Sequence, residues 1–131
     1  MKTPFLSRQL FFFGFLLWLI PFLAAFPLFP LKADHAVVFK SLMAVILGIT
    51  TSVLGSAYFA KIKASFSKHA SVTALIWILM SVAPDLLVFV IGMKMDSSTY
   101  FSEIASGYLV IPAILWGYAR LLEGRSARTA A

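Results

Sequence analysis

The chain of 131 residues has no cysteine and few charged side chains. The absence of cysteine excludes disulfide bonds, thiolate metal sites and thiol nucleophiles, and it leaves the redox compartment undetermined. Charged residues make up 12% of the chain, about half of the share in soluble domains. This is too little polar surface to cover a soluble fold. It also excludes intrinsic disorder, because disordered chains are rich in charge and poor in aromatic residues.

Apolar residues make up 61% of the chain, against roughly 45–50% in soluble proteins. They concentrate in four stretches that reach the length of about 20 residues needed to cross a bilayer as a helix. Short connections between such helices make neighbours antiparallel, and no repeat or linker divides residues 1–131. We therefore predict a single all-α domain, a four-span transmembrane helix bundle of up-down-up-down topology, with spans at residues 9–31, 38–60, 71–93 and 103–122.

The basic residues indicate the orientation, because cytoplasmic loops carry an excess of Lys and Arg. On one side of the predicted bundle there are only Lys32, Lys40 and Lys94. On the other side there are eight: Lys2, Arg8, Lys61, Lys63, Lys68, Arg120, Arg125 and Arg128. We therefore predict that both termini face the cytoplasm, in a multi-pass protein of a cell membrane of the bacterial inner-membrane type.

The net charge of +6 is scattered over the ends of the spans, where basic side chains meet anionic lipid headgroups. Nucleic acid binding requires a basic patch or stripe instead. The lipid bilayer is thus the predicted partner, and nucleic acid is not.

The first span has a second interpretation as a signal peptide. Lys2 and Arg8 precede an apolar run that reaches the small residues Ala24 and Ala25, as before a cleavage site. Cleavage there would leave three spans with the N-terminus outside. The apolar run continues to Leu31, which is long enough to span, so we favour an uncleaved helix.

Prolines interrupt the predicted spans. An interior proline removes a backbone donor and crowds the carbonyl four residues earlier, so we expect kinks at Pro21, Pro84 and Pro112. Pro27 and Pro30 are expected to unwind the end of the first span. A hinge or cavity is the functional interpretation of these prolines, and a bent helix facing lipid, which we favour, is the structural one.

Small residues recur in the second span and, more weakly, in the fourth. Such spacing allows close approach of helix backbones and hydrogen bonds between helices. We predict that these residues pack within the bundle or in a homodimer: Ala44, Gly48, Ser52, Gly55, Ser56, Ala113 and Gly117. Trp77 and Trp116 are assigned to an aromatic belt at the membrane interface, with a stacking platform for a ligand as the alternative.

Asp85 is the one ionisable residue well inside a predicted span. Insertion scales put such a residue at about +2.5–3.5 kcal/mol at the centre of a helix, and intramembrane acids are functional candidates by default. Tyr108 is predicted at the same depth and can donate to a carboxyl group. Ser81 lies one turn earlier and offers a hydroxyl to the same polar pocket.

Three interpretations of Asp85 remain open. In the first, it is a structural group that is hydrogen-bonded across helices in its neutral form, because no cation is predicted at its depth. In the second, it is a proton- or ligand-linked site. In the third, it lies at a distorted helix end that is open to water.

Catalytic signatures are absent from the sequence. His35 and His69 fall in predicted loops on opposite sides of the membrane, so they cannot share a metal. There is no glycine-rich phosphate loop, no zinc-protease motif and no serine triad pattern. We predict that the protein is not an enzyme and uses no metal or cofactor.

Several short motifs occur in a recognisable order. The first is residues 14–22 (GFLLWLIPF), near the start of the chain. The others follow in the second half: Ala74-Leu75-Ile76-Trp77, Pro84-Asp85-Leu86, Gly92-Met93-Lys94-Met95, Tyr100 and Tyr108-Leu109-Val110-Ile111-Pro112. In this order the chain resembles a family of small uncharacterised prokaryotic integral membrane proteins. The resemblance implies four helices with an aspartate in the third span, and it implies no substrate.

Together these observations favour a non-enzymatic structural or accessory membrane component whose polar residues serve helix packing. The alternative is a small oligomeric transporter or channel-like protein that uses Asp85 as a proton or cation site. Because four helices rarely enclose a pathway, this alternative requires a homodimer or another membrane partner.

Overall fold

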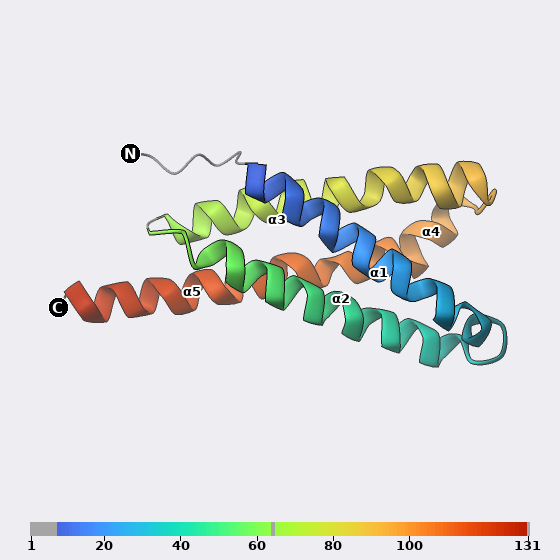
Figure 1. Ribbon diagram of the computed structural model, residues 1–131, viewed down its shortest axis with the longest axis horizontal. Coiled ribbons are helices and arrows are strands. Elements are labelled where there is room, and N and C mark those ends of the chain that lie inside the picture. The colour runs from blue at the N-terminus through green and yellow to red at the C-terminus, as the bar shows by residue number, and fades with distance from the viewer. Residues whose placement is uncertain (1–7, 64, 131) are drawn as a thin grey trace.

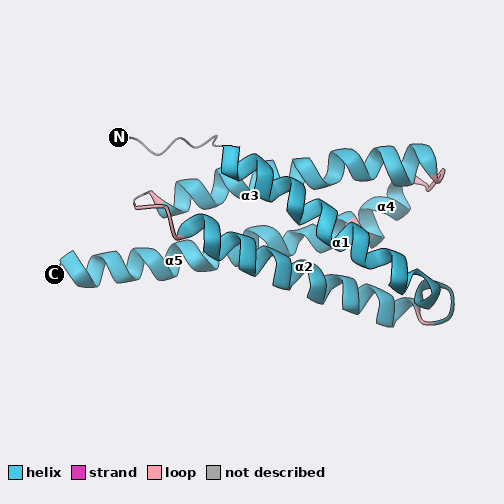
Figure 2. Ribbon diagram, viewed as in Figure 1, coloured by secondary structure: helices cyan, strands magenta, loops and turns pink. Residues whose placement is uncertain are grey.

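The computed structural model describes residues 8–63 and 65–130, and within them every regular element is helical (Figure 2). The elements, in chain order, are α1 (Arg8–Asp34), α2 (Ala36–Phe59), α3 (Phe66–Asp85), the π-helix η1 (Leu86–Gly92), α4 (Ser97–Glu103), the 3-10 helix η2 (Ala105–Leu109) and α5 (Val110–Ala130).

Four helical segments are long and apolar enough to cross a membrane: Arg8–Asp34, Ala36–Phe59, Phe66–Gly92 and Ser97–Thr129. The prediction of an all-helical fold with four helices able to cross a membrane is thereby confirmed. The third segment joins α3 to η1, and the fourth joins α4 and η2 to α5. In Figure 1 successive segments run in alternating directions, so that α1 begins and α5 ends at the same end of the bundle. We name this the terminal end and the opposite one the distal end.

The first span is longer and more regular than predicted. α1 continues through Pro21, Pro27 and Pro30 as far as Asp34, and only His35 separates it from α2. The expected unwinding at Pro27 and Pro30 is therefore wrong. Proline fixes φ near −65°, which is close to the helical value, so the helix continues past each proline although one backbone hydrogen bond is lost there.

The real irregularities lie in the third and fourth segments. Pro84 occupies the last turn of α3, and the chain then widens into η1, where the Met93 N–H donates to the Val88 carbonyl five residues back at 2.9 Å. Pro112 is the third residue of α5, where a missing N–H costs little. The interruption predicted at Pro112 lies before it instead, at Ile104 and η2.

The apolar core occupies the terminal half of the bundle. It comprises Leu10, Leu17, Leu47, Leu54, Tyr58, Phe59, Ile62, Phe66, Ala70, Ala74, Trp77, Ile111, Leu115 and Ala119. Trp77 is fully buried and donates from Nε1 to the Leu10 carbonyl at 2.9 Å. Its assignment to an interfacial belt is therefore wrong, since its bulk fills the gap between α1 and α3. Trp116 is half exposed.

Close approach of helices occurs at two glycines. A Cβ at Gly55 would lie 2.9 Å from Leu115 Cδ2, and a Cβ at Gly14 would lie 2.7 Å from Met80 Sδ. Gly55 belongs to the predicted small-residue set, whereas Gly14 does not. These two residues bring α2 against α5 and α1 against α3.

The other predicted packing residues do not pack tightly within the chain. Ala44, Ser56, Ala113 and Gly117 are exposed, a Cβ at Gly48 would meet nothing within 4 Å, and the half-buried Ser52 bonds its hydroxyl to the Gly48 carbonyl of its own helix at 2.8 Å. The buried side of α2 follows Leu47, Thr51, Leu54 and Tyr58 instead. Gly48 and Ser52 each lie one residue past this seam, about 100° around the helix. Packing of this set within the bundle is thus wrong except at Gly55 and at Ser52, whose carbonyl accepts from the Tyr118 hydroxyl of α5 at 2.9 Å. Packing in a homodimer stays a prediction.

Candidate functional site

Asp85 is 2% exposed and lies where three helical segments meet. Its Oδ1 accepts a hydrogen bond from Trp18 Nε1 of α1 at 2.7 Å. Its Oδ2 accepts from the hydroxyl of Tyr100 of α4 at 2.9 Å and from the hydroxyl of Tyr108 of η2. We name these four residues the Asp85 cluster. One carboxyl group thereby connects the first, third and fourth membrane-spanning segments.

The position of Asp85 follows from the pattern of α3. Buried residues recur every four positions along this helix, at Thr73, Trp77, Ser81 and Asp85, because residues four apart share a helix face. The apolar side chains on this face pack in the core, and Asp85 is the last residue on the face.

Aromatic neighbours hold two of the donors in place. The Trp18 indole is stacked on Phe22 of the same helix, with ring centroids 4.8 Å apart. The Tyr100 ring is stacked on Phe89 of η1 at 6.2 Å. The donors are therefore oriented by packing as well as by the carboxyl group.

The donor set is asymmetric in its chemistry. An indole N–H only donates, whereas a phenol hydroxyl donates or accepts. Oδ1 must therefore act as an acceptor, while Oδ2 faces two groups of either kind. Within the described part of the chain the ion pair between Lys40 and Glu103 is the only one, so Asp85 has hydrogen-bond donors and no cationic partner there.

The structure brings Tyr108 to Asp85 and leaves Ser81 out. The Ser81 hydroxyl is fully buried and has no hydrogen-bond partner among the described residues. Its predicted contribution to the polar pocket around Asp85 is therefore not seen. It lies one turn from Asp85 on the same face of α3 and forms no hydrogen bond with the carboxyl group.

Trp18 and Tyr100 were not predicted as partners of Asp85. Trp18 carried a signal, because an indole N–H in the middle of an apolar span requires an acceptor within the protein. Tyr100 was assigned to the loop 94–102, and the structure places it in α4.

The sequence feature that could have predicted α4 is its N-cap residue, Asp96. Asp96 accepts from the backbone N–H groups of Ser98 at 3.2 Å and Thr99 at 3.4 Å, which is the usual cap geometry for aspartate. Hydrogen bonds from the Ser98 hydroxyl and the Thr99 N–H lower the pKa of this exposed carboxyl group below its ordinary value. This cap starts the short helix that carries Tyr100 to the cluster.

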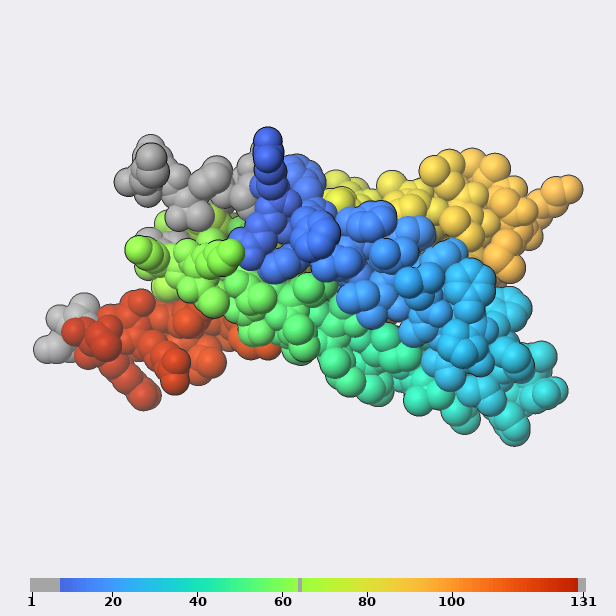
Figure 3. All heavy atoms as spheres, in the orientation of Figure 1, coloured from blue at the N-terminus to red at the C-terminus, as the bar shows by residue number. Residues whose placement is uncertain are grey.

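A cavity of about 410 Å³ extends from Asp85 and Tyr108 toward the distal end. We name it the distal fissure. It is lined mostly by apolar side chains of α1 and α2, among them Pro21, Phe29 and Leu47. In Figure 3 the α1–α2 pair and the α3–η1 segment diverge toward the distal end.

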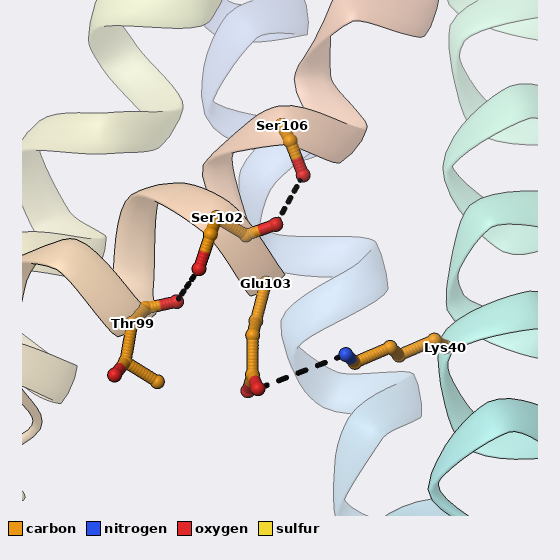
Figure 4. Close-up of polar contacts among 5 residues, drawn as sticks. All are labelled: Lys40, Thr99, Ser102, Glu103 and Ser106. Atoms are coloured by element: carbon orange, nitrogen blue, oxygen red, sulfur yellow. Dashed lines mark hydrogen bonds and ion pairs between the residues drawn. The ribbon is translucent and has the colours of Figure 1, made fainter.

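Charged side chains line the distal part of the fissure. Lys40 Nζ of α2 lies 3.7 Å from Glu103 Oε1 at the end of α4 (Figure 4), and Lys32 Nζ lies 5.6 Å from the centroid of the Phe29 ring. Beside Glu103, the Ser102 and Ser106 hydroxyls donate to the carbonyls of Thr99 and Ser102. These bonds satisfy backbone groups at the irregular junction of α4 and η2.

The two histidines lie at opposite ends of the bundle. His35 connects α1 to α2 at the distal end. His69 belongs to the first turn of α3, is 3% exposed, and lies with Nδ1 3.0 Å from the Tyr58 hydroxyl. Its prediction as a loop residue is wrong, because α3 begins at Phe66 and turns this face into the core. Within the described residues no group of three or more potential metal ligands comes together.

Comparisons of the chain with protein-family models, curated proteins and solved structures found no match. The resemblance to small four-helix prokaryotic membrane proteins therefore stays a prediction, and the argument for function rests on the Asp85 cluster and the distal fissure.

Proposed function

We propose that this chain is a non-enzymatic structural or accessory component of a bacterial-type inner membrane, with both termini in the cytoplasm. The observation that carries the proposal is the connection of Trp18, Tyr100 and Tyr108 through one carboxyl group. In this proposal the primary role of the Asp85 cluster is to hold the membrane-spanning segments together.

The irregular course of the chain from η1 to η2 explains why such a connection is needed. Non-helical or distorted backbone is tolerated at membrane depth only where protein covers it. No residue of η1 or η2 is buried, and of these two segments only Tyr108 packs against the core. Hydrogen bonds from α1 and α4 to Asp85 supply a fixed point in place of such packing, each contributing about 0.6–2 kcal/mol in a membrane.

A second candidate function is a small oligomeric, proton- or cation-linked transporter or channel-like protein. It is favoured by one observation, the distal fissure, which reaches Asp85 from the distal end. A pathway through the membrane would need a second copy of the chain, for which α2 offers the exposed small residue Ser56.

Ion flux measurements separate the two functions. Purified protein in sealed liposomes with a trapped pH dye is given a proton gradient and then gradients of Na⁺ and K⁺. The structural proposal expects the same flux as in empty liposomes. A flux that is present with the native chain and lost with Asp85→Asn would contradict the structural proposal and support the second function.

Reporter fusions test the orientation. The turn between Met93 and Asp96 lies at the distal end and contains no helix, so an insertion there disturbs no span. We expect a reporter that is active only outside the cytoplasm to work at this turn and to fail after Ala131. The opposite result would reverse the proposed orientation.

A further inference from the structure

The inner end of the distal fissure combines an acid with a nearly complete set of donors. A carboxylate has about four positions at which it accepts hydrogen bonds, and three are taken by Trp18, Tyr100 and Tyr108. Asp85 also lines the cavity. One acceptor position of the carboxyl group is therefore available to a molecule in the fissure, and no described cation forms an ion pair with Asp85.

Aromatic rings surround the same point. Phe22, Phe89 and Tyr108 line the fissure beside Asp85, and Trp18 is stacked on Phe22. The faces of aromatic rings attract cations within about 6 Å of the ring centroid, and tryptophan and tyrosine do so most strongly. The inner end thus offers a carboxyl group and several rings to a positive charge.

Basic residues lie far from this inner end. Along α1 the lining runs from Pro21 to Lys32, which is about 16 Å at the rise of an α-helix. The charge of Lys40 is compensated by Glu103 at 3.7 Å. The positive groups near the distal end therefore do not neutralise Asp85.

We propose that the distal fissure binds a lipophilic organic cation, with its cationic nitrogen at Asp85 and its apolar part along α1 and α2. A lipid acyl chain fits the apolar walls but would place hydrocarbon against the carboxyl group, which costs free energy. This inference goes beyond the structural role of Asp85, and it supplies a ligand class for the second candidate function.

Calorimetric titration tests the proposal with the full chain in nanodiscs of zwitterionic lipid. The probe is benzyltrimethylammonium, and its neutral control is neopentylbenzene, which has carbon in place of the quaternary nitrogen. We expect saturable binding of the cation and binding of the neutral analogue that is weaker by about tenfold or more, as for loss of one charged contact. Equal binding of both compounds would overturn the proposal.

Three variants locate the site. Asp85→Asn keeps the size of the side chain and should weaken binding of the cation by about tenfold or more. Asp96→Asn removes an exposed acid at the same end of the bundle and should leave binding unchanged. Ala44→Phe fills the fissure without removing a polar contact and should abolish binding.

The unfolding transition of each variant is measured beside its binding. Binding that is equal in the native chain and in folded Asp85→Asn overturns the cation site, as does the absence of saturable binding in the native chain. Either result leaves the structural role of Asp85 intact, because that role is measured by stability. If Asp85→Asn does not fold, unchanged binding by Ala44→Phe alone overturns the proposal.

Discussion

The two halves of the bundle are held together by different interactions. In the terminal half the helices meet through apolar side chains, with Trp77 at the centre and glycines at the closest contacts. In the distal half α1 and α2 separate from η1 and α4, and the segments meet through hydrogen bonds to Asp85 beside an open cavity.

The difference between the two halves shows two ways of holding helices together in a membrane protein, by apolar packing and by hydrogen bonds to a polar residue. Between helices in lipid, close packing contributes van der Waals energy without a hydrophobic driving force, and the terminal half relies on it. The distal half has less packing and more specific hydrogen bonds, which leaves room for a cavity. Stability is therefore concentrated at one end and the candidate site lies toward the other.

The largest effect is expected from Trp77→Ala in the terminal half. The change removes a fully buried ring and the hydrogen bond to the Leu10 carbonyl. Truncation of a buried tryptophan costs about 3–5 kcal/mol. Denaturant titration in mixed micelles measures the free energy of unfolding. A loss no larger than that of the half-exposed control Trp116→Ala would show that the terminal half is not the more tightly packed one.

Substitution of Asp85 tests the distal half. Asp85→Leu leaves the Trp18 N–H and two phenol hydroxyls without their acceptor, at a cost of about 1–3 kcal/mol. Asp85→Asn should cost less, because its amide oxygen accepts from Trp18 while its NH₂ donates to the tyrosine oxygens. The same unfolding titration distinguishes them. Equal stability of Asp85→Leu and the native chain would show that the cluster does not hold the distal half together.

Alanine at two glycines compares tight and open positions. A Cβ at Gly14 would lie 2.7 Å from Met80 Sδ and 2.9 Å from Trp77 Cδ1, so Gly14→Ala should destabilise the fold by about 1 kcal/mol or more. At Gly117 a Cβ meets nothing within 4 Å, so Gly117→Ala should stabilise α5 by up to about 1 kcal/mol. A Gly14→Ala variant as stable as the native chain would contradict the close contact between α1 and α3.

The smallest effect concerns the exposed N-cap of α4. Hydrogen bonds from Ser98 and Thr99 lower the pKa of Asp96 below the ordinary value of 3.8, so the folded state favours the ionised form. Its contribution to stability is present above the unfolded pKa and is lost as pH falls through the folded pKa. The protection factors of the Ser98 and Thr99 amides, which correct for the intrinsic pH dependence of exchange, should therefore fall in acid. Asp96→Asn, which keeps a cap without a titrating group, should remove this pH dependence; an unaltered profile would argue against the cap.

The four helical segments were predictable because each depends on local composition. A run of about 20 apolar residues favours insertion into lipid through its own composition, independently of the other segments. Asp85 was identifiable for the same reason, since a carboxyl group is conspicuous in such a run. The predicted first span ended at Leu31 because the apolar run ends there, before Lys32, whereas α1 continues as a helix to Asp34.

The partners of Asp85 were only partly predictable, because depth in the membrane does not specify rotation about a helix axis. Tyr108 could be placed at the right depth, whereas Trp18 lies on another helix, and Tyr100 lies on a short helix whose cap, Asp96, had been assigned to a loop. The buried seam of α2 was misplaced for a related reason. Small residues mark where helices are able to approach, but the large side chains on both helices decide where they do.

The sequence alone thus predicted a membrane protein, its helical class and one acid inside a span, because these depend on free energies of transfer that each segment has by itself. Tertiary structure decided which donors meet that acid, which small residues lie in contacts and where a cavity remains. These features depend on how four helices rotate and tilt against one another, and that arrangement is a property of all the contacts together.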